Sequence, residues 1–87
     1  MDKILVYFTP FAAESQIWLV KDGKASCSHT SSVIEDVALN IIGLAYSQNT
    51  YNVFVSAPYS MVTEITRLVQ EKEYNNYSIN KINVEGI

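Results

Sequence analysis

The chain has 87 residues, of which 48% are apolar and 17% are charged, and its formal net charge is −3. A chain of this length buries about 60–65% of its unfolded surface, so we expect one compact domain over residues 1–87 that folds without metals, disulfides or a cofactor. Six scattered basic residues make nucleic acid an unfavoured partner, and the single cysteine excludes an internal disulfide and a cysteine-built metal cage.

The start of the chain lacks the features of a secretory signal. Residues 1–6 move directly into a short apolar run, without the basic start and small-residue cleavage site of a signal peptide. No segment approaches the roughly 20 apolar residues that span a bilayer. We therefore expect a soluble, cytoplasmic protein that does not associate with membranes.

Three strands are predicted before the first helix. Residues 3–9 are β-formers without polar alternation, which is typical of a strand covered on both faces. Residues 16–21 and 24–30 follow, joined by the dipeptide Asp22-Gly23, which accepts the positive φ angles of a type I′ turn. The connection from Pro10 to Ser15 is short enough for a second hairpin. The three strands are therefore expected to be antiparallel.

The first helix is predicted to begin at a capping box and to end at about Ser47. In that box, Ser32 and Glu35 each bind a free backbone donor at the helix start. The helix is apolar around most of its circumference, so it is either sandwiched between other elements or half of an interface. A homodimer through this helix is an accompanying expectation. The predicted dimer face comprises Leu39, Ile42 and Tyr46.

The second half of the chain reads as strand, helix and strand. Residues 51–56 form the strand, and an amphipathic helix follows from about Ser60 to Tyr74, where Asn75-Asn76 ends it. Residues 82–85 alternate apolar and polar side chains, which indicates a half-exposed edge strand.

The predicted fold is α/β (α+β), with the element order β-β-β-α-β-α-β. Because a crossover through a helix makes its two strands parallel, the fourth strand can lie beside the first. The result is a five-stranded mixed sheet in the order 3-2-1-4-5 with two helices. A different α/β sandwich, in which the last strand pairs elsewhere, is the alternative. In the predicted order, residues 9–12 and 56–59 flank the crevice at the carboxyl ends of two parallel strands, which is the default ligand site of such a sheet.

In this order of elements the chain resembles the ribonuclease H-like fold in miniature. Residues 5–9 stand where the first strand of that family leads to its first catalytic aspartate. Residues 33–35 stand where its first helix carries a glutamate, and residues 53–59 where its fourth strand ends in a second aspartate. The resemblance implies a site in which these carboxylates jointly hold two metal ions.

The residues at these positions do not fit that chemistry. The first position holds Thr9 or Pro10 and the third holds Ser56 or Ala57, so only Glu35 remains. One carboxylate cannot hold two divalent cations. We therefore expect no catalytic residue and no metal ligand.

Other chemistries find no better support. Cys27 and His29 are expected to share a face of one strand, about 6.6 Å apart along it, which makes a nucleophile–base hydrogen bond awkward. We interpret them as a core cysteine beside a surface or interfacial histidine. The paired acids Glu71 and Glu73 are expected on the solvated face of the second helix. Three glycines provide no loop that cradles a phosphate.

Surface recognition remains as the expected function. Phe11, Pro58 and Tyr59 are predicted to bind a partner near the strand-end crevice, and the alternative is that they close over the ends of the core. We expect a non-catalytic protein-interaction module, a regulator or inhibitor of the kind that phages and mobile elements encode, which binds a larger protein. The alternatives are a degenerate ribonuclease H-like domain that binds nucleic acid without cleaving it, and a metal-dependent nuclease or other hydrolase completed by a partner.

Overall fold

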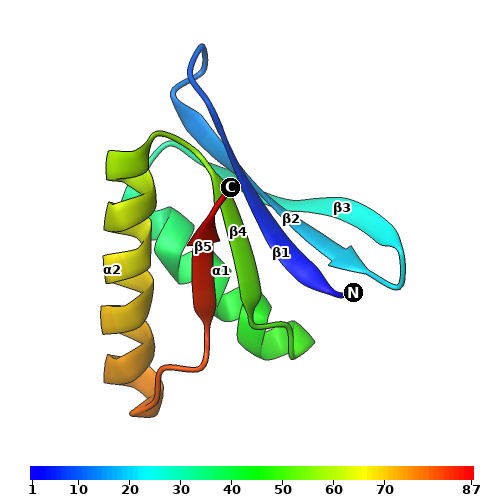
Figure 1. Ribbon diagram of the computed structural model, residues 1–87, viewed down its shortest axis with the longest axis vertical. Coiled ribbons are helices and arrows are strands. Elements are labelled where there is room, and N and C mark those ends of the chain that lie inside the picture. The colour runs from blue at the N-terminus through cyan, green and yellow to red at the C-terminus, as the bar shows by residue number, and fades with distance from the viewer.

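The computed structural model of the protein describes residues 1–87 and contains five strands and two helices in the predicted order (Figure 1). The elements are β1 (Lys3–Thr9), β2 (Glu14–Lys21), β3 (Lys24–Ser31), α1 (Ile34–Gln48), β4 (Asn52–Ser56), α2 (Tyr59–Tyr77) and β5 (Asn83–Gly86).

All five strands belong to one mixed sheet in the order β3-β2-β1-β4-β5. Strand β2 is antiparallel to both β1 and β3, whereas β4 is parallel to both β1 and β5. The predicted fold class, strand order and number of helices are therefore confirmed.

Only one face of the sheet is covered by helices. In β1, Ile4 and Val6 are 0% and 1% exposed, whereas Leu5 is half-buried and Tyr7 is 44% exposed. Successive side chains of a strand point to opposite faces, so the helices pack on the face of Ile4 and Val6 alone. Figure 1 shows α1 behind the strands and α2 beside β5. The prediction that this strand is covered on both faces is wrong, because the chain has two helices and both pack on the same side.

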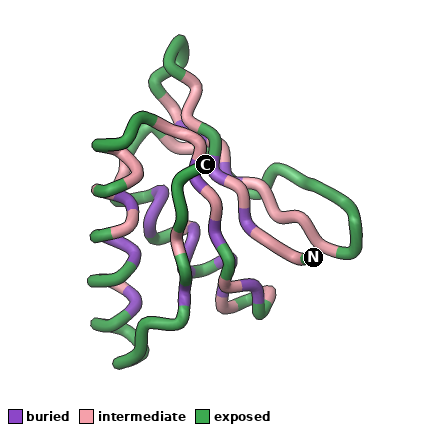
Figure 2. The backbone as a smooth tube through the Cα atoms, in the orientation of Figure 1, coloured by how far each residue is buried: buried purple, intermediate pink, exposed green.

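A core of 15 buried apolar residues lies between this face and the helices. Figure 2 shows the buried positions along both helices and the central strands, whereas β3 is exposed almost throughout. Helix α1 packs against α2 and against the sheet, which explains why it is apolar around most of its circumference. The radius of gyration is 11.8 Å, and about 12 Å is expected for a compact domain of this length.

The start of α1 differs from the prediction. Its N-cap residue is Val33, and no side chain caps the helix. The N–H of Val33 donates to Ser31 Oγ at 3.1 Å, and the carboxylate of Glu35 instead meets Lys72 Nζ at 3.5 Å. The predicted capping box of Ser32 and Glu35 is therefore wrong, because the preceding strand already provides the turn at Ser31.

Helix α2 extends beyond its predicted end at Tyr74 and includes Asn75-Asn76. Its last residue is Tyr77. The C-cap residue Ser78 has a left-handed φ of 56°, and its N–H donates to the carbonyl oxygen of Tyr74 at 2.8 Å. The last turn brings the Tyr77 ring onto Tyr46 of α1, with stacked ring centroids 3.9 Å apart. This tertiary contact outweighs the weak helix propensity of asparagine.

Candidate functional site

The carboxyl ends of β1 and β4 lie side by side, because Tyr7 pairs with Ser56 in the parallel register. The predicted adjacency of these strand ends is therefore confirmed, but no crevice lies there, because the one groove on the surface is lined by residues of α2. The residues at the strand ends carry hydroxyl or apolar side chains and no carboxylate. They are Thr9, Pro10, Ser56 and Ala57.

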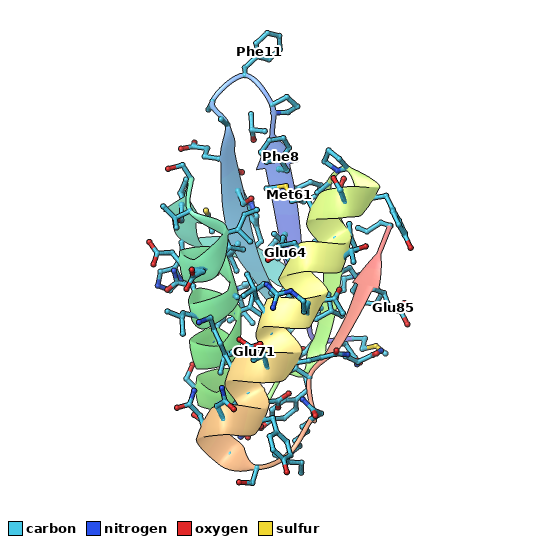
Figure 3. The ribbon with its side chains drawn as sticks, turned by 90° about the vertical axis from the view of Figure 1, so that its left-hand side faces the viewer. Phe8, Phe11, Met61, Glu64, Glu71 and Glu85 are labelled. Atoms are coloured by element: carbon cyan, nitrogen blue, oxygen red, sulfur yellow. The ribbon has the colours of Figure 1, made fainter.

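The three residues predicted to bind a partner near these strand ends are exposed. Phe11 is fully exposed at the tip of the turn between β1 and β2, which projects beyond the rest of the chain (Figures 1 and 3). Pro58 is the N-cap residue of α2, and the side chain of Tyr59, the first residue of that helix, is 86% exposed. They do not close over the ends of the core, so that alternative is wrong. Their role in partner binding stays a prediction.

Glu35, the remaining carboxylate of the resemblance, lies on the surface. Its side chain is 68% exposed, and Lys72 is its ion-pair partner. No group of three or more His, Cys, Asp or Glu side chains could hold a metal ion. The two-metal arrangement implied by the resemblance therefore has no counterpart in the side-chain geometry.

No hydrogen bond joins the Cys27 thiol to the His29 ring. The register of β3 shifts at this point, so that Cys27 lies opposite Trp18 and His29 lies opposite Ile17, neighbours on β2 that point to opposite faces. The thiol lies 3.7 Å from the carbonyl oxygen of His29, and His29 Nδ1 lies 2.8 Å from Ser28 Oγ. Cys27 is exposed, so its interpretation as a core cysteine is wrong, because β3 is an edge strand outside the core.

The uncovered face of the sheet carries a row of apolar side chains. Leu5 pairs with Trp18 on β2 and with Phe54 on β4, and paired residues point to the same face. All three are partly exposed, and none belongs to the core. Tyr7 and Val20 lie two residues further along the same face of β1 and β2. We call these five residues the open-face cluster: Leu5, Tyr7, Trp18, Val20 and Phe54.

The surroundings of the open-face cluster are polar. The charged side chains that the register places on this face are Lys3, Glu14 and Glu85. An aromatic and aliphatic centre with a polar rim is the usual anatomy of a protein–protein interface. A single lysine does not make the basic groove that accompanies base stacking in nucleic-acid binding.

The open-face cluster was not predicted, because β1 is apolar on both faces. Its sequence pattern is therefore the same as that of a strand buried on both sides. The signal that could have revealed the cluster is the number of elements. Two helices that pack against each other can cover one face of a five-stranded sheet, and the other face then has no cover.

The predicted dimer face on α1 is not one exposed surface. Leu39 is 48% exposed, whereas Ile42 is 5% exposed and lies in the core. Tyr46 is partly buried and stacks on Tyr77. Of the three residues, Leu39 alone is available to a second molecule without rearrangement of the helices.

Glu73 is the one ionisable side chain that is fully buried, at 0% exposure. Its carboxylate accepts hydrogen bonds from the Tyr46 hydroxyl and from the backbone N–H groups of Lys81, at 3.0 Å, and Ile82, at 3.1 Å. Its predicted place on a solvated face is wrong, because the last turns of α2 point this side of the helix toward the segment before β5.

Tyr46, which donates to Glu73, also packs against other side chains. Burial, with the hydrogen bond to Glu73 as a second cause, raises the pKa of Tyr46 to about 12. The Tyr46 ring meets the Tyr51 ring edge-on, with centroids 5.3 Å apart, and Lys81 Nζ lies 4.2 Å from the centroid of Tyr51. The three hydrogen bonds of the Glu73 carboxylate join α1, α2 and the segment before β5.

No protein-family model matches the chain, and no curated protein matches it in sequence. Neither helix is both long and apolar enough to cross a membrane. The fold and the surface together define a small α+β domain whose mixed sheet has one helix-covered face and one open apolar face.

Proposed function

We propose that the protein is a non-catalytic protein-interaction module, a regulator or inhibitor that binds a larger protein through the open-face cluster. The observation that carries this proposal is the uncovered row of Leu5, Trp18 and Phe54 across three neighbouring strands. Contiguous apolar side chains with a polar rim are typical of interaction sites, and aromatic residues at the centre of such a patch are typical energetic hot spots.

The charges suggest what the partner's surface is like. Glu14 and Glu85 outnumber Lys3 on this face, and the whole chain carries a net charge of −3. Complementary charge favours a partner whose apolar patch has a basic rim. Further contacts to the same partner would come from the residues that follow the ends of β1 and β4, which are Phe11, Pro58 and Tyr59. The exposed free thiol of Cys27 suits a reducing compartment, which supports action in the cytoplasm.

The test is affinity capture of the tagged protein from nuclease-treated lysate of its native host, compared with the variant Leu5→Lys. Leu5 is at the centre of the open-face cluster, so a lysine there places a charge in the apolar contact. We expect a stoichiometric protein partner with the wild type and a loss of affinity of about tenfold or more with the variant. The single tryptophan, Trp18, lies in the contact, so its fluorescence should change when the purified partner is added.

The matched control is Leu39→Lys, which makes the same substitution at an exposed leucine on α1. It should capture the partner as the wild type does, and circular dichroism should show both variants folded. Equal capture by Leu5→Lys and the wild type would overturn the proposal. Binding that disappears with nuclease treatment and weakens steeply with salt would favour nucleic acid instead.

A further inference from the structure

The one concave site on the surface runs along α2. It is an open groove of about 450 Å³, and the side chains that line it are Tyr59, Val62, Thr63, Thr66, Arg67 and Gln70. With about 100° of rotation per residue, these positions occupy one flank of the helix, next to the buried stripe that contains Ile65 and Val69.

This flank of α2 faces strand β5. A Cβ atom on Gly86 would lie 3.3 Å from Val62 Cγ1, and Val62 lines the groove. The end of β5 therefore lies next to the groove. The opposite flank faces α1, to which Lys72 is joined by its ion pair with Glu35. Figures 1 and 3 both show α2 and β5 running alongside each other. The groove therefore opens beside the outer edge of β5.

The outer edge of β5 presents unpaired backbone groups. The N–H groups of Asn83 and Ile87 donate toward the β4 side, at 2.8 Å and 2.9 Å. Because backbone groups alternate sides along a parallel strand, the N–H and C=O groups of Val84 and Gly86 point outward. No strand lies beyond β5, and no loop or side chain of the protein binds these outward groups.

Glu73 marks where this edge begins. The N–H of Ile82 is the preceding outward donor, and the carboxylate of Glu73 binds it at 3.1 Å. A side chain of α2 thus satisfies the first outward donor of the edge. The next two residues with outward donors, Val84 and Gly86, are left open beside the groove.

We propose that this edge is a docking site for an extended segment of a partner protein, which adds to the sheet as a sixth strand and lies against the flank of α2. Strand addition to an exposed sheet edge is a general mode of peptide recognition, with affinity from the backbone and specificity from the neighbouring side chains. The dimensions agree, because the rise of α2 from Tyr59 to Gln70 is about 16 Å, which is also the length of about five strand residues.

The side chains of the groove define the chemistry of that segment. Thr63, Thr66 and Gln70 are polar and uncharged. The guanidinium of Arg67 is already paired with Glu64, at 2.6 Å, and with Glu71, at 3.5 Å. The groove therefore fits an uncharged segment with β-branched or hydroxyl-bearing residues at alternate positions. The groove shares Tyr59 with the residues predicted to bind the open-face partner, but it contains no residue of the open-face cluster, so either proposal can fail without the other.

The test uses a phage-displayed library of random linear peptides, selected on the intact protein. Peptides recovered above background are synthesised and titrated into isotope-labelled protein. We expect shifts of the amide signals of Val84 and Gly86, together with those of Thr63 and Thr66. N-methylation of alternate residues of the peptide, which removes backbone donors, should lower its affinity by about tenfold or more.

Two variants separate edge pairing from other contacts. Val84→Pro removes an outward N–H, a substitution that an edge strand tolerates, and Thr63→Trp fills the groove from the exposed side of α2. Each should weaken the peptide by about tenfold or more, whereas the control Asn76→Trp, on the same helix beyond the groove, should change its affinity by less than about twofold. Thr63→Trp keeps the test valid if Val84→Pro does not fold.

Three outcomes would overturn the proposal. They are a selection that yields no peptide above background, amide shifts confined to the open-face cluster, and equal binding by the wild type and Thr63→Trp. The Leu5→Lys variant should bind the peptide as the wild type does, so a failure of this proposal is distinguishable from a failure of the open-face proposal.

Discussion

At the scale of single residues, Glu73 and Tyr46 join three parts of the chain. Tyr46 belongs to α1, Glu73 belongs to α2, and the backbone of Lys81 and Ile82 leads into β5. A buried carboxylate is costly unless hydrogen bonds satisfy it, and here two backbone donors and one hydroxyl do so. The pair therefore fixes where α2 ends relative to the edge strand.

The raised pKa of Tyr46 predicts how stability depends on alkaline pH. The pKa is about 12 in the folded protein and about 10 in the unfolded chain. Between these values Tyr46 has lost its proton in the unfolded state and keeps it in the folded state. The contribution of the protonated Tyr46 hydroxyl to the free energy of unfolding is therefore complete below pH 10 and is lost as the pH rises through 12. Denaturant unfolding of the wild type and Tyr46→Phe between pH 8 and 12 measures it.

The free energy of unfolding of the wild type minus that of Tyr46→Phe should be constant up to about pH 10. It should then fall as the pH rises from about 10 to about 12, because only the wild type loses the contribution of the Tyr46 hydroxyl. The other tyrosines are common to both proteins, so their ionisation cancels in the comparison. A difference that stays constant to pH 12 would mean that the Tyr46 hydroxyl is not held by Glu73 as described.

At the scale of elements, two glycines are expected to affect stability in opposite ways, although both have room for a side chain. Gly23 follows Asp22 in the turn between β2 and β3, where the φ angles of 53° and 76° are those of the predicted type I′ turn. Gly43 lies within α1 on its exposed side. A Cβ added at either position would meet nothing within 4 Å. The backbone conformation alone therefore decides how an alanine at either position changes the free energy of unfolding.

We predict that Gly23→Ala lowers the free energy of unfolding by about 1 kcal/mol, because alanine is strained at positive φ. Gly43→Ala should raise it by about 1 kcal/mol, because glycine is a poor residue inside a helix. Thermal and denaturant unfolding of the two variants measure both values. Stabilisation by Gly23→Ala would show that the turn does not have the left-handed geometry described.

Element boundaries were predicted less well than element types, for identifiable reasons. The alternation, apolar runs and Asp22-Gly23 turn are local signals, and they correctly predicted each strand and helix. The end of α2 depends on the stacking of Tyr77 on Tyr46, a contact between distant parts of the sequence. The start of α1 depends on the turn that Ser31 makes at the end of β3. No local pattern contains these contacts.

At the scale of the whole molecule, one core connects both helices with three central strands. Ile17 of β2 belongs to this core, although its neighbour Trp18 lies on the open face. Strand β3 provides no core residue and is held by its pairing with β2. The predicted single domain would therefore unfold as one cooperative unit that includes β2.

Thermal unfolding tests this expectation with two probes. Trp18 fluorescence reports on β2, and far-ultraviolet circular dichroism reports mainly on the helices. We expect coincident transitions and a heat-capacity change of about 1.2 kcal/mol/K, from about 14 cal/mol/K per residue. A fluorescence transition well below the transition in helicity would show that the β2–β3 hairpin separates from the rest before the core melts.

The sequence by itself determined the order of elements, the order of strands and the lack of a carboxylate cluster at the strand ends. These follow from local patterning, from the parallel pairing that a helical crossover imposes, and from residue identity. The tertiary structure alone decided that both helices take the same side, that Leu5, Trp18 and Phe54 are left uncovered, and that α2 lies beside the free edge of β5. The physical reason is that each of these depends on how elements distant in the sequence pack together, which no local pattern specifies.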